Sequence, residues 1–375
     1  MPLRMLVLAS YPDRAACTRF RVAEYARPLA EEGIEVRVCP ALDDAAFAKF
    51  YGSTSRAGKG TSILHGTVRQ LVALSRRDVD VVFVQREATL VGPVFMEWIA
   101  ALFRGLPLIY DLDDAVWQTE TTYSQHPLAA RLLRSPGKTW SLLRMASHVV
   151  AGSHYLRRVA SEYNPNVTIL PTVVPAEKWR PLAGRLEGHF ARPSGPPVIG
   201  WIGTQSTANT LEVAASALRR LRGAGRHFIL RVIGAKEEFR IPGLEHEVAP
   251  WRLENEIEDF QNIDVGIAPL LPIEYSKGKC GFKVLQYMAV GVPSISTPDG
   301  GGVDFVREGE NALFARTEDD WFRALAALLD DRELRKRIAR GGRALVERSH
   351  STEAQAPRLA AIVRGVAGDR VATAE

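Results

Sequence analysis

The chain contains only three cysteines, Cys17, Cys39 and Cys280, among 375 residues. They are too few and too scattered for a disulfide framework or a zinc site, and they agree with a reducing compartment. No apolar run is long enough to span a bilayer. The apolar stretch at residues 1–10 is short and is followed at once by Tyr11-Pro12-Asp13, which favours a buried strand over a signal peptide. We therefore expect a cytoplasmic protein.

Two common nucleotide-binding motifs are also missing. Neither a G-x-G-x-x-G nor a G-x-x-x-x-G-K-[ST] run is present, which argues against a Rossmann oxidoreductase and a P-loop enzyme. The net charge of +5 and the pI of about 9.1 suit an anionic partner. Basic residues are dispersed among carboxylates, without the ladder of aromatic and basic side chains that binds single-stranded nucleic acid. We expect no nucleic-acid partner.

Apolar runs alternate with amphipathic stretches along the whole chain, which predicts βαβ units in parallel sheets. A chain of this length is expected to form two domains. The strands predicted for the first domain are 3–9, 35–39, 79–85, 107–111, 148–152 and 167–170. The helices predicted beside them are 20–32, 93–103, 138–145 and one that Ser153 caps and that ends at Glu162.

The alternation restarts after a proline-rich segment. The strands predicted there are 198–202, 227–233, 265–269 and 293–297, and the helices are 211–221, 255–260, 282–290, 320–329, 333–348 and 354–366. The fold class is thus α/β, with two doubly wound Rossmann-like sheets that we expect to face each other across a cleft. The predicted parts are an N-terminal domain (1–172), a linker (173–197), a C-terminal domain (198–350) and a last helix (351–375) returning to the N-terminal domain.

The segment 263–302 is the most informative. A predicted buried strand leads into a polar loop with Lys277 and Lys279, and the loop opens a helix with Lys283 and Gln286 in its first turns. A helix N-terminus carries unpaired N–H groups and a partial positive charge, so phosphate could bind there. The alternative is a surface loop with solvated lysines that leads into a core helix.

Lys283 and the run Gln286–Pro293 (QYMAVGVP) resemble the donor-binding signature of family 4 glycosyltransferases, in a branch with K-x-x-[EQ]-Y-M-A. The resemblance implies the GT-B fold and a nucleotide-sugar donor. Two positions depart from the family's E-x7-E pattern: Gly278 replaces the glutamate that binds the transferred sugar, and Gln286 replaces the one that binds ribose. The donor sugar therefore stays open, with Glu274 or Asp299 as candidate substitutes.

Two further segments resemble parts of the family's donor domain. Residues 199–212 look like its first strand and loop, although ordinary helix capping explains the same hydroxyl residues. The run 299–302 (DGGG) resembles a loop near the donor in that family, and a flexible turn is the alternative. For Trp251 we expect either a place in the pocket for the nucleotide base or a place in the hydrophobic core. The expected donor-binding residues are Gly203, Thr204, Lys279, Gly281, Phe282, Lys283 and Gln286.

The densest acid cluster follows a predicted strand of the first domain. Asp111, Asp113 and Asp114 (DLDD) resemble the D-x-D-D-A segment of the same branch, and carboxylates at a strand's carboxyl end can accept a proton or bind sugar hydroxyls. We expect these three, with Lys283, to be the catalytic residues. An Asx turn that caps a helix and a divalent-metal site are the alternatives, but the resemblance implies chemistry without a metal.

Acceptor contacts are expected at Arg19, Arg86 and Glu87, where simple salt bridges explain the residues equally well. The run 131–144 mixes basic and apolar residues, which suits peripheral contact with anionic lipid at the inner face of a membrane or an ordinary surface helix.

The resemblance thus implies a metal-independent glycosyltransferase that retains the anomeric configuration. It uses a UDP- or GDP-linked sugar as co-substrate and needs no cofactor. The acceptor is a glycan, a lipid-linked molecule or a small molecule, and the pathway is polysaccharide, glycolipid or secondary-metabolite biosynthesis. The other functions that we consider are a nucleotide-sugar epimerase of the same fold and a non-catalytic sugar-nucleotide-binding module.

Overall fold

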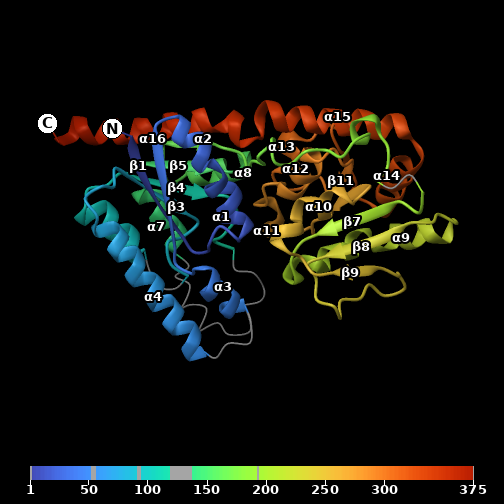
Figure 1. Cartoon of the computed structure of the whole chain (residues 1–375), viewed down its shortest axis with the longest axis horizontal. Coiled ribbons are helices and arrows are strands. Elements are labelled where there is room, and N and C mark those ends of the chain that lie inside the picture. Colours follow the sequence, from blue (N-terminus) through green and yellow to red (C-terminus); the bar gives the residue numbers. More distant parts are fainter. Residues whose placement is uncertain (1, 52–55, 91–93, 119–136, 192–193, 375) are drawn as a thin grey trace. The chain divides into compact units, whose positions relative to one another are not determined.

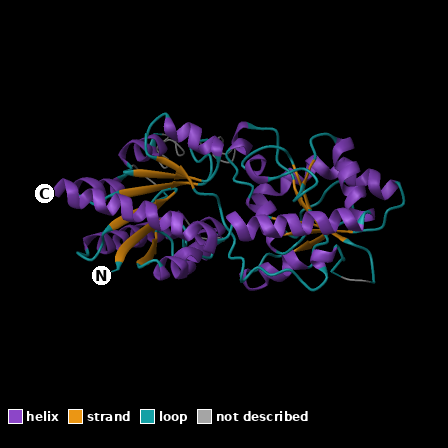
Figure 2. Ribbon diagram, turned by 90° about the horizontal axis from the view of Figure 1, so that it is seen from above, coloured by secondary structure: helices purple, strands orange, loops and turns teal. Residues whose placement is uncertain are grey.

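The computed structural model describes residues 2–51, 56–90, 94–118, 137–191 and 194–374. The chain divides into two compact units. Unit 1 comprises residues 1–172 and 352–375, and unit 2 comprises residues 173–351. Each unit contains a six-stranded parallel sheet, and helices pack on both faces of each sheet (Figure 2). The predicted α/β class with two doubly wound sheets is therefore confirmed.

The sheet of unit 1 has the strand order β2-β1-β3-β4-β5-β6, with every neighbouring pair parallel. The chain starts in β1, adds β2 on one side and then crosses to β3 on the other. The switch point at which ligands bind in such sheets lies at the carboxyl ends of β1 and β3. The strands are β1 (Leu3–Ala9), β2 (Ile34–Pro40), β3 (Val81–Gln85), β4 (Leu108–Leu112), β5 (His148–Ala151) and β6 (Val167–Ile169).

The helices of unit 1 surround this sheet (Figure 1). Ser153 caps α8 as predicted, because its hydroxyl accepts from the Leu156 backbone N–H at 3.3 Å. Residues 44–51 and 56–75, for which the sequence suggested no element, form α3 and α4. The helices are α1 (Ala16–Arg21), η1 (Ala23–Tyr25), α2 (Ala26–Glu31), α3 (Asp44–Tyr51), α4 (Arg56–Ser75), α5 (Phe95–Trp98), η2 (Ile99–Phe103), α7 (Lys138–Met145), α8 (His154–Ser161) and α16 (Thr352–Ala374).

The helix predicted over 20–32 is divided into α1, η1 and α2. The division lies at Val22, whose φ of −140° and ψ of −54° are not helical. The side chain of Arg21, immediately before it, is directed to the sheet and binds Asp111. A tertiary contact therefore overrides the local helical pattern at this point.

The sheet of unit 2 has the order β12-β11-β10-β7-β8-β9, again parallel throughout. Its switch point lies between β7 and β10. The short strands β9 and β12 were not predicted. The strands are β7 (Val198–Ile202), β8 (Ile229–Ile233), β9 (Glu247–Ala249), β10 (Val265–Ala268), β11 (Ser294–Ser296) and β12 (Leu313–Phe314).

The helices of unit 2 agree with the sequence pattern within a few residues, and part of the predicted loop before 282 forms the one-turn helix α11. They are η4 (Arg185–Glu187), η5 (Gln205–Leu211), α9 (Glu212–Gly223), η6 (Leu253–Asn255), α10 (Glu256–Gln261), α11 (Glu274–Lys277), α12 (Phe282–Ala289), α13 (Gly302–Phe305), α14 (Glu318–Asp330) and α15 (Arg332–Ser349).

Residues 173–197, which we expected to act as a linker, pack into unit 2. The buried guanidinium of Arg185 donates to the Asp264 carboxylate at 2.9 Å and to the backbone carbonyls of Gln261 and Ile263 at 2.7 Å. Asp264 also accepts from the backbone N–H of Ala191 at 2.6 Å. A buried ion pair with these extra hydrogen bonds fixes the segment against the sheet.

The last helix, α16, groups with unit 1 and packs against α2. Arg364 forms an ion pair with Glu32 at 2.9 Å, and Arg358 donates to the carbonyl of Ile169 at 3.1 Å. No helix in the described ranges is long and apolar enough to cross a membrane.

Candidate active site

In unit 2 a tyrosine holds α12 on the sheet at the switch point. The ring of Tyr287 packs over Gly266 of β10, where an added Cβ would lie 2.6 Å from the ring. The Tyr287 hydroxyl donates to the carbonyl of Gly200 in β7 at 2.9 Å. Since Tyr287 is fully buried, it fixes the position of the helix relative to both strands.

The start of α12 is packed against the DGGG loop. Gly281 has φ +68°, and a Cβ there would lie 2.9 Å from backbone atoms of Gly302. Gly300 has φ +67°, and its Cβ would lie 2.6 Å from the carbonyl oxygen of Lys279. The N–H of Gly301 donates to that same oxygen. Only glycine allows this close contact between the two loops.

Lys283 is the half-buried cation of this region. Its Nζ lies 5.2 Å from the ring centroid of Trp201, which is fully buried in β7. No carboxylate among the described residues forms an ion pair with it. Burial, together with the nearby charge of Lys279, lowers the pKa of Lys283 to about 8. An anion beside this ammonium would offset both effects.

Gln286 lies one turn further along α12. Its side chain is 4% exposed, and within the described part of the chain its amide makes no hydrogen bond. An amide without a hydrogen bond to the protein can donate to or accept from a polar ligand atom. Phe282, in the first turn of the helix, is half-buried.

The other lysines of the loop have contacts of their own. Lys277 forms an ion pair with Glu274 at 2.6 Å, and both side chains are exposed. Lys279 donates to the Tyr275 hydroxyl at 3.0 Å and lies 4.1 Å from the centroid of that ring. Of the three lysines that we expected at the anion site, the structure thus distinguishes Lys283.

The loop after β7 is shaped by capping. The hydroxyls of Thr204 and Thr207 form a capping box at the start of η5, and the Thr204 N–H donates to Thr207 Oγ1 at 3.2 Å. Gly203 lies against Trp201, whose ring would be 2.4 Å from a Cβ at this position. Trp251 is half-buried rather than a core residue. The cap is thus Thr204, which we expected to contact phosphate, and its observed contacts are those of a helix cap.

In unit 1 the acid cluster lies at the carboxyl end of β4, and its first member, Asp111, is part of the strand and fully buried. Arg21 Nε donates to the two carboxylate oxygens of Asp111 at 3.2 and 3.1 Å, and Arg21 Nη1 donates to the carbonyl of Leu170 at 2.8 Å. Burial raises the pKa of Asp111, although Arg21 opposes the shift. The catalytic role that we expected for Asp111 does not fit this geometry, because Asp111 is 0% exposed and occupied by Arg21.

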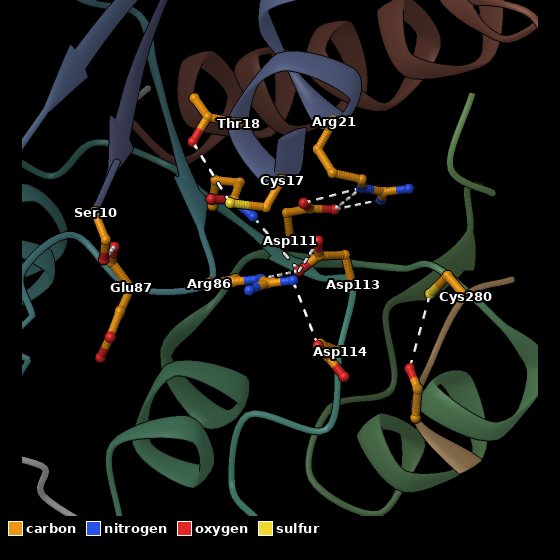
Figure 3. Close-up of polar contacts among 12 residues, drawn as sticks. Ser10, Cys17, Thr18, Arg21, Arg86, Glu87, Asp111, Asp113, Asp114 and Cys280 are labelled. Carbon is orange, nitrogen blue, oxygen red and sulfur yellow. Dashed lines mark hydrogen bonds and ion pairs between the residues drawn. The ribbon is translucent and has the colours of Figure 1, made fainter. Parts of the chain in front are cut away.

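Asp113 lies near the switch point and binds Arg86 (Figure 3). Arg86 Nε and Nη2 donate to its two carboxylate oxygens at 2.6 and 3.0 Å. Arg86 directly follows β3 and has φ +59°, the only positive φ of a non-glycine residue in the described part of the chain. Such strain concentrates at functional sites. The Arg86 side chain keeps 26% of its surface exposed, so a ligand can reach this pair.

The remaining predicted residues of unit 1 differ in role. Asp114 lies 3.6 Å from Arg86 and also accepts from the Ala115 backbone N–H at 2.9 Å, as in a turn. Glu87 forms an ion pair with the buried Lys138 at 3.3 Å. Arg19 is buried and donates to the carbonyl of Arg14 at 2.9 Å. Arg19 therefore orders its own loop, which does not match the expected acceptor contact.

The sequence analysis missed two residues of these sites, and part of one predicted segment lies outside the described residues. The sequence singled out neither Arg21 nor Trp201, because both act through residues distant in the chain. Residues 131–136 of the predicted membrane segment lie outside the described residues, whereas Lys138–Met145 form the predicted helix. Among the described residues no group of three or more His, Cys, Asp or Glu side chains could hold a metal ion.

Residues 196–331 match the family model described as glycosyl transferases group 1. This range contains β7, α12, Lys283 and the DGGG loop. No curated protein matches the chain. The family match agrees with the resemblance of the K-x-x-Q-Y-M-A motif, which the structure places at the switch point of unit 2.

Several solved structures share the fold over almost the whole chain. HepE from Anabaena, in complex with UDP-glucose, has 14% identity and a TM-score of 0.66, with 97% of this chain and 100% of that chain covered. A glycosyltransferase from Rickettsia africae has 14% identity, a TM-score of 0.68 and coverage of 97% and 98%. Sucrose-phosphate synthase from Thermosynechococcus elongatus has 14% identity, a TM-score of 0.65 and coverage of 98% and 99%. The chain therefore has the GT-B fold and carries a group 1 glycosyltransferase domain over residues 196–331.

Proposed function

We propose that this protein transfers a glycosyl group from a nucleotide-sugar donor bound by unit 2 to an acceptor bound by unit 1. The observation that carries the proposal is Lys283, a half-buried ammonium at the switch point with no acidic partner among the described residues. A diphosphate is the ligand that best matches such a cation beside the start of a helix.

The donor contacts follow from the surroundings of Lys283. Its ammonium, with the first N–H groups of α12, would stabilise the diphosphate as it departs. Gln286, whose amide makes no hydrogen bond within the described residues, would bind a ribose hydroxyl. Because HepE was solved with UDP and with UDP-glucose, UDP sugars are the first candidates and GDP sugars the second.

We assign the acceptor side to Asp113 rather than to the buried Asp111. Asp113 is 8% exposed and is held by the reachable guanidinium of Arg86. Its carboxylate would orient an acceptor hydroxyl or the reacting sugar. The reaction would retain the anomeric configuration, as the resemblance implies. It would need no metal, since the Lys283 ammonium and the start of α12 would offset the diphosphate charge. Excess EDTA should leave turnover unchanged, and NMR of the product should show the anomer of the donor.

The first test is a thermal-shift screen with UDP, GDP, ADP and TDP sugars. A ligand that binds the folded state raises the melting temperature by mass action. The donor that binds is then incubated with candidate glycan, lipid-linked and small-molecule acceptors. Stabilisation by one nucleotide class that is lost in Lys283→Ala supports the proposal. An epimerised donor in the absence of acceptor, or no stabilisation by any nucleotide, contradicts it.

A further inference from the structure

The segment 86–89, which follows β3, is bound by buried side chains from four separate parts of unit 1. These side chains come from the end of β1 and from α4, α5 and α7, and each forms a hydrogen bond with the backbone of the segment. The bonds join Ser10 Oγ to the Glu87 carbonyl at 2.8 Å, Gln70 Nε2 to the Ala88 carbonyl at 2.8 Å, Glu97 Oε1 to the Ala88 N–H at 3.0 Å and Lys138 Nζ to the Thr89 carbonyl at 2.6 Å. We call Ser10, Gln70, Glu97 and Lys138 the clamp residues.

Lys138 is buried at a place where an ammonium does not stabilise its own helix. It is the first residue of α7 and is 6% exposed, and the partial positive charge of a helix N-terminus repels a cation. Besides its bond to Thr89, it forms an ion pair with Glu87 at 3.3 Å. Burying a charge is costly unless the charge is paired and hydrogen-bonded. Since both partners of Lys138 belong to the segment 86–89, its contacts indicate that it holds this segment.

Glu97 is a second buried ionisable group that binds the same segment. Its side chain is fully buried, and its carboxylate accepts from the N–H of Ala88. Burial raises the pKa of Glu97, and the charge of Lys138 opposes this shift. Two ionisable side chains are thus kept in the interior of unit 1, and both bind the segment 86–89.

The segment that they hold begins with Arg86 in a strained backbone conformation. Arg86 has φ +59°, and a non-glycine residue in this region persists only where the surrounding contacts enforce it. Its N–H donates to the carbonyl of Asp111 at 3.1 Å, and the clamp residues fix the backbone that follows. In this conformation the guanidinium binds Asp113 through Nε and Nη2 at 2.6 and 3.0 Å.

We propose that the clamp residues are positioning residues, which fix the segment 86–89 and thereby hold the Arg86 guanidinium against Asp113. This role rests on the proposed function, because Asp113 is the residue that we assign to the acceptor side. The clamp residues all belong to unit 1, whereas the donor site lies in unit 2. Loss of a clamp bond should therefore displace Arg86 and leave the binding of UDP unchanged.

Cys17 provides a readout of the Arg86 position that needs no substrate. Its side chain lies beside the pair of Arg86 and Asp113 (Figure 3). Burial raises the pKa of the Cys17 thiol, and the positive charge of Arg86 opposes this shift. Iodoacetamide alkylates the thiolate, so the rate of Cys17 alkylation as a function of pH follows the pKa of this thiol. Peptide mass spectrometry distinguishes Cys17 from the two other cysteines, which are buried.

The test compares the pH profile of Cys17 alkylation in the full wild-type chain and in variants of it. The Arg86→Met variant gives the profile of the thiol without the guanidinium. In Lys138→Met and in Ser10→Ala the profile should move from that of wild type toward that of Arg86→Met by at least about 0.5 pH unit, because a cation beside a thiol changes its pKa by about one unit or more. Ser10→Ala removes no charge, so its shift reports the position of Arg86 alone.

Asn164→Ala is the matched control, because Asn164 holds the opposite end of α7. Its buried amide donates to the carbonyls of Leu143 and Ala146 at 2.7 Å. The variant loosens the same helix as Lys138→Met but leaves the segment 86–89 intact, so its Cys17 profile should be that of wild type. Circular dichroism and the melting temperature establish that each variant is folded. If Lys138→Met does not fold, the profile of Ser10→Ala decides.

Wild-type profiles in folded Lys138→Met and Ser10→Ala would overturn the proposal. So would an equal shift in Asn164→Ala, because the clamp residues would then act on stability alone, and so would a wild-type profile in Arg86→Met. UDP should raise the melting temperature of Lys138→Met and Ser10→Ala as much as that of wild type, and a smaller rise would contradict the assignment to the acceptor side. If UDP fails to stabilise wild type, the proposed function fails, whereas the alkylation profiles still decide the role of the clamp residues.

Discussion

The ammonium of Lys283 lies 5.2 Å from the ring centroid of Trp201, and no described carboxylate neutralises it. Because β7 and α12 carry the two residues, the distance between them is set by the packing of the sheet and not by a loop. The indole face attracts the cation weakly, whereas a phosphate would attract it strongly. The free protein is thus organised for an anion at this point.

Replacement of Lys283 by alanine should lower kcat by about two to three orders of magnitude, because the charge that stabilises the departing diphosphate is lost. Lys277→Ala is the matched control, since Lys277 is exposed and pairs with Glu274. Steady-state kinetics and melting temperatures of both variants provide the comparison. Wild-type kinetics in folded Lys283→Ala would remove this lysine from the mechanism.

The affinity for UDP should fall as the pH rises above about 8. The pKa of Lys283 in the free protein is about 8, and a bound diphosphate should raise it, so binding takes up protons between pH 8 and the higher pKa of the complex. Below that window the lysine is charged in both states, and affinity is independent of its titration. Calorimetry in buffers of different ionisation enthalpy measures the uptake. Lys283→Met should bind UDP weakly and should no longer take up protons on binding. Proton uptake that persists in this variant would mean that another group titrates.

Asp111→Asn should mainly lower the stability of the protein, whereas Asp113→Asn should mainly lower kcat. Asp111 is 0% exposed and binds Arg21, so its neutral variant should lose about 3 to 5 kcal/mol of unfolding free energy. Asp113 binds the partly exposed Arg86, and its variant should keep most of its stability while kcat falls by about a hundredfold or more. Urea unfolding and kinetics separate the two. A stable but inactive Asp111→Asn would restore Asp111 to the chemistry.

The strands could be predicted because buried parallel strands are apolar on both faces, as Leu3–Ala9 and Val198–Ile202 show with their predicted bounds. The anion-site motif at Lys283 was also visible, since its residues are close in sequence. The pairing of Arg21 with Asp111 joins residues 90 apart, and no local pattern indicates it. Such a partner decides whether an aspartate is structural or reactive.

The segment 173–197 shows the same limit for domain boundaries. Its prolines exclude regular helix, but they do not exclude burial. Arg185 and Asp264, 79 residues apart, hold the segment in unit 2. The opposite failure concerns α4, where no element was assigned because its apolar residues occupy both the buried and the exposed side. Amphipathic periodicity is weak in such a helix, and the structure alone reveals which side is exposed.

Gly300→Ala should damage donor binding more than its backbone strain alone explains. Gly300 has φ +67°, and an added Cβ would lie 2.6 and 2.7 Å from the carbonyl oxygens of Lys279 and Ser276. Gly225 is the matched control, because it has φ +79° but no atom within 4 Å of an added Cβ. Gly225→Ala should therefore report the strain alone, about 1 to 2 kcal/mol of unfolding free energy.

The clash at Gly300 must displace the loop that ends at Gly281 and opens α12, so the first N–H groups of that helix would move relative to Lys283. We expect the KM for the donor to rise at least about tenfold in Gly300→Ala and to stay near wild type in Gly225→Ala, since small displacements of a binding group are costly. Kinetics at saturating acceptor, with urea unfolding of both variants, measure the difference. Equal KM values in two equally destabilised variants would mean that the contact between the DGGG loop and Lys279 supports the fold and not the donor.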